Sequence, residues 1–124
     1  MSDLAEFVAA RLDEDEAAAK AVTFRSRFEA DGHHVHSPGG LGSPPMPLAD
    51  VIDAETAAHI ARHDPARVLR EVAVMRAILE HCARADGDSP RDRERGRWDS
   101  SNETMRILGT IWHDHPDYRP EWKP

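Results

Sequence analysis

The sequence has little of what disulfide-rich, membrane-spanning or nucleic-acid-binding proteins need. Its one cysteine, Cys82, excludes an internal disulfide and a cysteine zinc knuckle. No stretch approaches the roughly 20 apolar residues of a membrane span, and the N-terminus lacks the layout of a signal peptide. Only Lys20 and Lys123 are lysines, and a net charge of −7 argues against binding to a phosphate backbone. We therefore expect a cytoplasmic protein with no membrane partner and no direct nucleic-acid binding.

Two helices are predicted near the ends of the chain. Residues 2–22 begin with Ser2, a residue type that caps helices, and carry an apolar stripe at helical spacing: Leu4, Phe7, Val8 and Leu12. Residues 100–114 open with Ser100 and Glu103 in a capping-box arrangement, followed by a second stripe: Met105, Ile107, Leu108, Ile111 and Trp112. The acidic run in the first helix is expected to be a solvated face, with an acidic interaction surface as the alternative.

The centre of the chain predicts two helices separated by a bend. Asp53 is placed to cap a short helix over 54–63. Asp64 and Pro65 then supply a second cap followed by proline at the first helical position, which favours a new helix over 65–85. Apolar residues spaced 4, 3, 4 and 3 apart make this the central packing helix: Val68, Val72, Met75, Leu79 and Cys82.

The remaining segments look irregular. Seven of the ten residues from 38 to 47 are Gly or Pro, too many for a helix or a central strand. Asp31 and Gly32 have the chemistry of a tight turn, but the flanking residues do not alternate cleanly between apolar and polar. We predict an all-α fold: one domain over 1–124 that forms a bundle of three to four helices, with a flexible Gly/Pro-rich loop over 29–50 and an extended tail over 115–124.

Histidine is the one residue type that suggests chemistry. His59 and His63 lie four apart on a predicted helix, so both imidazoles could share a divalent metal ion such as zinc. His115 is the favoured third ligand, and the alternatives are Glu55, Asp64 and His113. Ile60 follows His59 where a zinc-protease helix would have Glu, so that motif is absent. The simpler explanation is that the helix dipole favours protonated histidine near a helix C-terminus.

Three blocks of the sequence carry a resemblance to a known family: residues 10–16 (ARLDEDE), 59–72 (HIARHDPARVLREV) and 114–122 (DHPDYRPEW). In combination they resemble a family of small uncharacterised proteins, a domain of unknown function, of actinobacteria and their phages. The resemblance implies a bacterial or phage origin and brings no activity, cofactor or catalytic residue. It also places Tyr118 and Trp122 in a family block, and we predict that these two aromatics are docking or interaction residues.

The sequence contains no complete catalytic constellation, so no catalytic residue is assigned. The leading hypothesis is a non-enzymatic protein-interaction or accessory module with a protein partner and no cofactor. The alternative is a metal-binding protein or metal-dependent hydrolase that uses His59, His63 and His115. A homodimer through the exposed side of the central helix is left open.

Overall fold

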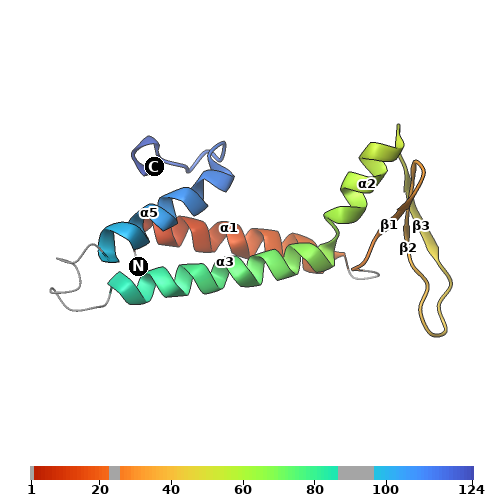
Figure 1. The fold of residues 1–124 in the computed structure, drawn as a ribbon, viewed down its shortest axis with the longest axis horizontal. Coiled ribbons are helices and arrows are strands. Elements are labelled where there is room, and N and C mark those ends of the chain that lie inside the picture. The colour runs from red at the N-terminus through yellow and green to blue at the C-terminus, as the bar shows by residue number, and fades with distance from the viewer. Residues whose placement is uncertain (1, 23–25, 87–96) are drawn as a thin grey trace. The chain divides into compact units, whose positions relative to one another are not determined.

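The computed structural model describes residues 2–22, 26–86 and 97–124 (Figure 1). Along the chain, the elements are α1 (Asp3–Ala21), β1 (Glu29–Asp31), β2 (His34–Ser37), β3 (Met46–Asp50), α2 (Ala54–Arg62), α3 (Pro65–Asp86), α5 (Arg97–Gly109) and two 3-10 helices, η1 (Thr110–Trp112) and η2 (Pro120–Trp122). Two compact units emerge from the contacts. We call residues 1–14 with 72–124 the helical unit and residues 15–71 the sheet unit. In the described part of the chain, no helix is both long enough and apolar enough to cross a membrane.

The prediction of an all-α fold was wrong, because residues 29–50 contain a three-stranded antiparallel sheet in the order β1-β2-β3. The fold is mixed α/β, and the supposed flexible loop is largely a pair of hairpins. Gly32 has a φ of +56°, so a two-residue loop can join β1 directly to β2. Only β2 alternates between inward and outward side chains, with Val35 and Ser37 each 1% exposed. β1 and β3 are almost wholly exposed, which is why the apolar alternation of a sheet is missing from the sequence.

The predicted caps and bend around α2 are confirmed. The side chain of Asp53 accepts a hydrogen bond from the Thr56 amide at 2.6 Å, and α2 ends before α3 begins at Pro65. Asp64, between the two helices, uses both carboxylate oxygens. Oδ1 accepts from the Arg67 amide at 2.9 Å, which caps α3, and Oδ2 accepts from the Phe28 amide at 3.1 Å. The same carboxylate therefore begins a helix and fixes the chain that enters β1.

Within the sheet unit, α2 packs on β1 and β2 (Figure 1). Ala57 is fully buried in α2, and its small side chain lets the helix approach the strands closely. β3 is an edge strand that pairs with β2 through an irregular register between Val35 and His36. The sheet is thus covered by a helix with only a small apolar contact surface.

The helical unit holds most of the buried apolar side chains. The predicted stripe of the first helix is confirmed, since Leu4, Phe7, Val8 and Leu12 are all at most 8% exposed. Arg76 of α3 donates to Asp13 of α1 at 2.8 Å, which links the two helices within this unit. A Cβ added at Gly109, the last residue of α5, would lie 3.2 Å from the Leu4 side chain, so this glycine allows α5 to approach α1. α5 begins at Arg97, which puts Ser100 inside the helix and not at its N-cap.

The prediction of an extended tail over 115–124 was wrong in part. The tail passes through turns after η1 and then forms η2, in which Trp122 is buried. The amides of Tyr118 and Trp122 donate to the carbonyls of His115 and Arg119. These short-range bonds fold the tail into a compact segment.

Candidate interaction surface

The predicted metal ligands lie in different parts of the chain. In the sheet unit, His59 and His63 sit one turn apart with ring centroids 4.5 Å from each other, and both are exposed. His115 belongs to the helical unit, where Nη1 of Arg11 donates to its ring, in closest contact with Nε2, and the Asp117 amide donates to Nδ1 at 3.0 Å. Among the described residues, no group of three or more His, Cys, Asp or Glu side chains is placed to hold a metal ion. The metal site and the hydrolase remain predictions.

The two aromatic residues of the tail pack inside the helical unit. The ring of Trp122 lies 5.1 Å from that of Phe7 and 5.7 Å from that of Tyr118, measured between centroids. Tyr118 is in turn 5.9 Å from Phe7, in an edge-to-face arrangement. Both therefore make contacts within their own unit, and a role in binding a partner remains a prediction.

Arg11 is a buried cation that the sequence did not single out. It lies one helical turn after Phe7, and its guanidinium stacks 5.2 Å from the centre of that ring. Nη2 donates to Glu14 at 2.9 Å, while Nη1 donates to the His115 ring of the tail. Arg119 adds a second tie between the tail and α1 through Asp3, at 2.9 Å. Three residues of the family blocks, Arg11, His115 and Arg119, thus have a structural role, because they hold the tail against α1.

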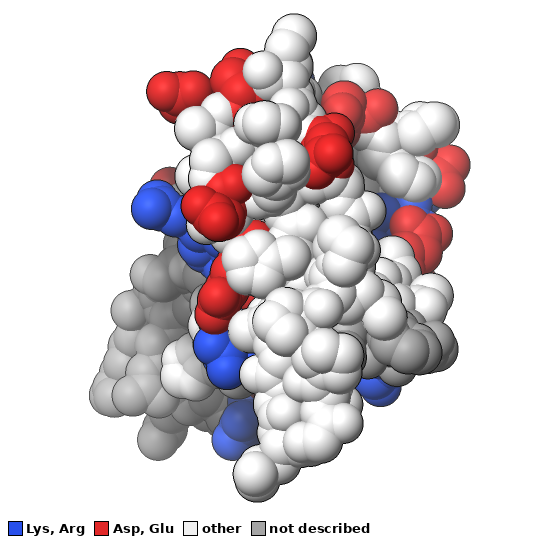
Figure 2. Space-filling model, turned by 90° about the vertical axis from the view of Figure 1, so that its right-hand side faces the viewer, with Lys and Arg blue, Asp and Glu red and all other residues white. Residues whose placement is uncertain are grey.

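Among the described residues of the sheet unit, the most exposed apolar residue is Leu41, in the connection between β2 and β3, followed by Ile52. Residues 37–49, which we call the uncharged segment, contain no Asp, Glu, Lys or Arg, although 31% of the whole chain is charged. Leu41 is fully solvent-exposed, and Leu48 is 40% exposed. Figure 2, which looks onto the side that carries the sheet, shows a broad area without charged side chains in its lower part. Interface centres are typically depleted in charged residues, so this surface suits contact with a protein.

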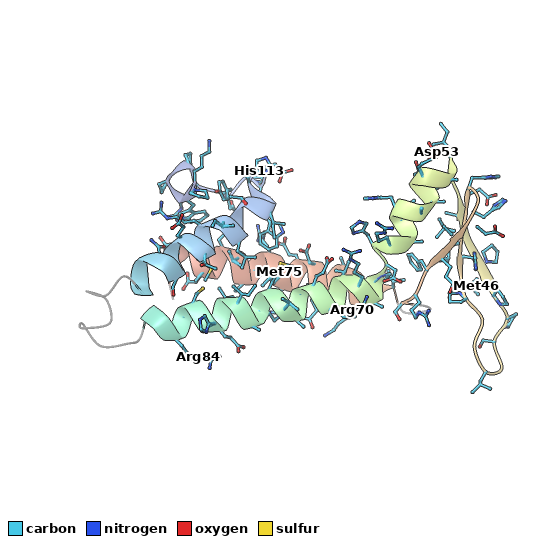
Figure 3. The ribbon with its side chains drawn as sticks, viewed as in Figure 1. Met46, Asp53, Arg70, Met75, Arg84 and His113 are labelled. Atoms are coloured by element: carbon cyan, nitrogen blue, oxygen red, sulfur yellow. The ribbon has the colours of Figure 1, made fainter. Side chains whose placement is uncertain are left out.

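The opposite end of the sheet is acidic. At that end, His34 of β2 is in register with Asp31 of β1 and Asp50 of β3, whereas Ser37 at the other end pairs with Met46 and leads into the uncharged segment. Figure 3 shows Asp53 and Met46 toward these two ends. Hydrogen bonding to His34, followed by the charges of His34 and His33, lowers the pKa of Asp50. The sheet therefore has an acidic end, and the uncharged segment at its other end borders the exposed side chain of Arg27.

These features define a small mixed α/β protein with an acidic sheet and an exposed uncharged connection. The chain belongs to the family of unknown function DUF6221, whose model matches residues 1–124. No curated protein and no solved structure matches it. Membership of a family of unknown function, which the three sequence blocks suggested, is confirmed. The bacterial or phage origin stays a prediction.

The surface of the sheet unit was missed by reasoning from sequence, although two signals were present. One is the uncharged segment itself, which was interpreted only as a Gly/Pro-rich loop. The other is the absence of Lys and Arg from residues 28–61, a stretch that contains five carboxylates: Glu29, Asp31, Asp50, Asp53 and Glu55. A count of charge by segment would have found both signals, since the net charge of the whole chain hides where the charge lies.

Proposed function

We propose that this protein is a non-enzymatic protein-interaction module of bacterial or phage origin, which acts in the cytoplasm as an accessory to a protein partner. The observation that carries the proposal is the full exposure of Leu41 within the uncharged segment. An exposed leucine contributes nothing to the folding of the chain that presents it. It becomes favourable only when another surface removes it from water.

The backbone around this residue also supports a binding role. Gly40 and Ser43 exchange two backbone hydrogen bonds of 3.0 Å each, which closes a turn with Leu41 at its tip. A segment that is already ordered loses less conformational entropy on binding than a free loop does. The uncharged segment is therefore better suited to specific recognition than its Gly and Pro content suggests.

Affinity capture tests the proposal. The full chain, immobilised through an added C-terminal linker, is exposed to a lysate of the organism that encodes it, next to an unrelated protein of the same size and net charge. We expect at least one protein to be enriched stoichiometrically on the full chain and not on the control protein. Equal capture by the two, or no enriched protein, would refute a protein-interaction role.

A further inference from the structure

Beside the turn that carries Leu41, the sheet unit has a polar hollow of about 460 Å³. Ligand sites in proteins typically measure about 300–1,000 Å³, so the hollow is large enough to admit a ligand group. Its wall combines glycine backbone, serines and one cationic side chain: Ser26, Arg27, Ser37, Gly39, Gly40 and Ser43. Gly40 and Ser43 also close the turn with Leu41 at its tip, so the hollow and the exposed leucine belong to one surface.

Arg27 gives this hollow a positive charge. It is the single Lys or Arg between residues 26 and 61, and its side chain is 73% exposed. Glu29 lies 3.9 Å from its guanidinium, which makes an ion pair too long for a hydrogen bond. Within the described part of the chain, no other carboxylate pairs with Arg27, so the guanidinium keeps its five N–H donors for a ligand.

The backbone on both sides of Arg27 is fixed. The Ser26 carbonyl accepts a hydrogen bond from the Ala66 amide at 2.9 Å, and the Phe28 amide donates to Oδ2 of Asp64 at 3.1 Å. Both bonds tie this stretch to the beginning of α3. Binding therefore immobilises the arginine side chain without ordering the backbone that carries it, which favours affinity.

A buried hydroxyl also lines the hollow. Ser37 is 1% exposed, and among the described residues its hydroxyl has no hydrogen-bond partner. A buried polar group without a partner costs free energy, which a ligand oxygen at hydrogen-bond distance would recover. This observation is independent of Arg27 and indicates the same class of ligand, one that presents acceptor oxygens.

The single cation limits the charge of that ligand. A carboxylate is a planar monoanion, and it matches the fork of one guanidinium with two parallel hydrogen bonds. A phosphate group carries a charge of about −1.5 to −2. Among the described residues of the wall, Arg27 alone would have to neutralise it. The exposed Leu41 adds an apolar contact beside the hollow, so the ligand combines a carboxylate with apolar neighbours, as Asp and Glu do on the surface of a folded protein.

We infer that the hollow beside the Leu41 turn binds an Asp or Glu side chain of the partner protein, with Arg27 as its counter-ion and Ser37 as a hydrogen-bond donor. The inference rests on the proposed function and names the chemistry that the partner presents. Leu41 contacts the apolar surface around that carboxylate. The carboxylates at the other end of the sheet take no part.

Peptide titration of the isotope-labelled full chain tests the class of ligand. The probe is the peptide Gly-Leu-Glu-Gly, acetylated and amidated at its ends, and its control is Gly-Leu-Gln-Gly. We expect the Glu peptide to shift the amide resonances of Gly39, Gly40 and Ser43, and the Gln peptide to bind about 10-fold more weakly, because it lacks the charge-assisted hydrogen bonds. Equal shifts with both peptides, or no shift with either, would overturn the inference.

Two further probes distinguish the source of the anion. Acetyl-Gly-Leu carries a C-terminal carboxylate, and phenyl phosphate carries a dianion. We expect both to bind more weakly than the Glu peptide. A terminal carboxylate lacks the methylenes that carry a Glu carboxylate into the hollow, and the dianion exceeds the charge of Arg27. Tighter binding of either probe would overturn the assignment of an Asp or Glu side chain.

Substitutions at the guanidinium test the contacts. We expect Arg27→Gln to weaken binding of the Glu peptide about 10-fold, and Arg27→Lys to weaken it less, because lysine keeps the charge and loses the fork. Arg62→Gln, which changes another exposed arginine of the same unit, is the matched control and should leave binding unchanged. Equal binding by Arg27→Gln and the wild type would overturn the inference.

Glu29→Gln is expected to act in the opposite direction. It removes the carboxylate that competes for Arg27, so the Glu peptide should bind about 2- to 5-fold more tightly. Tighter binding cannot result from a loss of folding, which makes this variant a check on the others. Weaker binding by Glu29→Gln would contradict the role of Arg27 as the counter-ion.

Capture from a lysate separates this inference from the proposed function. The immobilised wild type is compared with Arg27→Gln and with Arg62→Gln. We expect the enriched protein to be retained about 10-fold less on Arg27→Gln and equally on Arg62→Gln. Equal retention on all three would overturn the carboxylate site while leaving the protein-interaction role intact. The absence of an enriched protein on any of them would refute the proposed function itself.

Discussion

Different interactions stabilise the helical unit and the sheet unit, each within itself. The helical unit buries large side chains such as Phe7, Leu12, Leu79, Met105 and Trp122. In the sheet unit, the buried apolar residues are small, and Val35 is the largest of them in the described part. The sheet unit relies more on hydrogen bonds that the side chains of Asp53 and Asp64 accept from backbone amides. Burial of large apolar groups is the stronger source of stability, so the sheet unit is the more easily opened of the two.

A region that retains few apolar contacts within itself leaves its apolar and charged groups available for another molecule. The tail of the helical unit shows the opposite outcome, since Tyr118 and Trp122 are engaged by Phe7. Aromatic residues therefore do not by themselves identify the binding surface of this protein.

The largest effect is expected for Trp122→Ala in the helical unit. The variant removes a ring that is 8% exposed and leaves a cavity beside Phe7, which should lower the free energy of unfolding by about 3–5 kcal/mol. Urea denaturation of this variant and of the exposed control Ile111→Ala gives the comparison. Equal midpoints for both variants would contradict a docked tail.

A smaller loss is expected for Asp64→Ala in the sheet unit. The variant removes the cap of α3 and the acceptor of the Phe28 amide, so we expect about 2–3 kcal/mol of local destabilisation. Hydrogen exchange should show faster exchange in β1 and β2, with little change in α5. Asp53→Ala, which removes only the cap of α2, serves as the matched control and should cost about 1 kcal/mol. Similar exchange of β1 in both variants would contradict the second role of Asp64.

Acidification should weaken the sheet unit through Asp53. Hydrogen bonds from Thr56 lower the pKa of this carboxyl below its ordinary value. A lowered pKa in the folded state means that the stabilisation is fully present above about pH 4 and is lost as the pH falls through the folded pKa. We expect the protection of the amides at the start of α2 against hydrogen exchange, relative to an unstructured peptide at the same pH, to fall below pH 4 in the wild type and to change less in Asp53→Asn. Identical pH profiles for the two proteins would exclude this role.

The smallest effect on stability is expected for Leu41→Ser. Because the side chain is fully exposed, the free energy of unfolding should change by no more than about 0.5 kcal/mol. Thermal unfolding monitored by circular dichroism measures this change, with Val35→Ala as a buried control from the same sheet. A loss for Leu41→Ser as large as that for Val35→Ala would show that the leucine is a folding residue.

The helices could be predicted because their signals are local. Asp53 followed by α2, and Asp64 followed by Pro65 and α3, are caps and breaks that act within four residues of chain. The sheet could not be predicted in the same way, since its strands are short and two of them face solvent along nearly their whole length. The turn at Gly32 was recognised chemically, but the inward residues that would confirm a strand are only Val35 and Ser37.

The sequence by itself determined where α1 and α3 begin, which face of α1 is apolar, and the family to which the chain belongs. The last helix was predicted less well, because α5 begins at Arg97 and not at Ser100, and Ile107 and Ile111 of its predicted apolar stripe are each 55% exposed. Tertiary structure alone decided the pairing of β1, β2 and β3, the burial of Arg11 against His115, and the docking of Trp122 on Phe7. These contacts join residues that are 3 to 115 positions apart. Helical signals repeat every three or four residues and can be recognised along the chain. Which strands pair and which side chains from the two ends of the chain meet depends instead on how the folded segments pack in three dimensions.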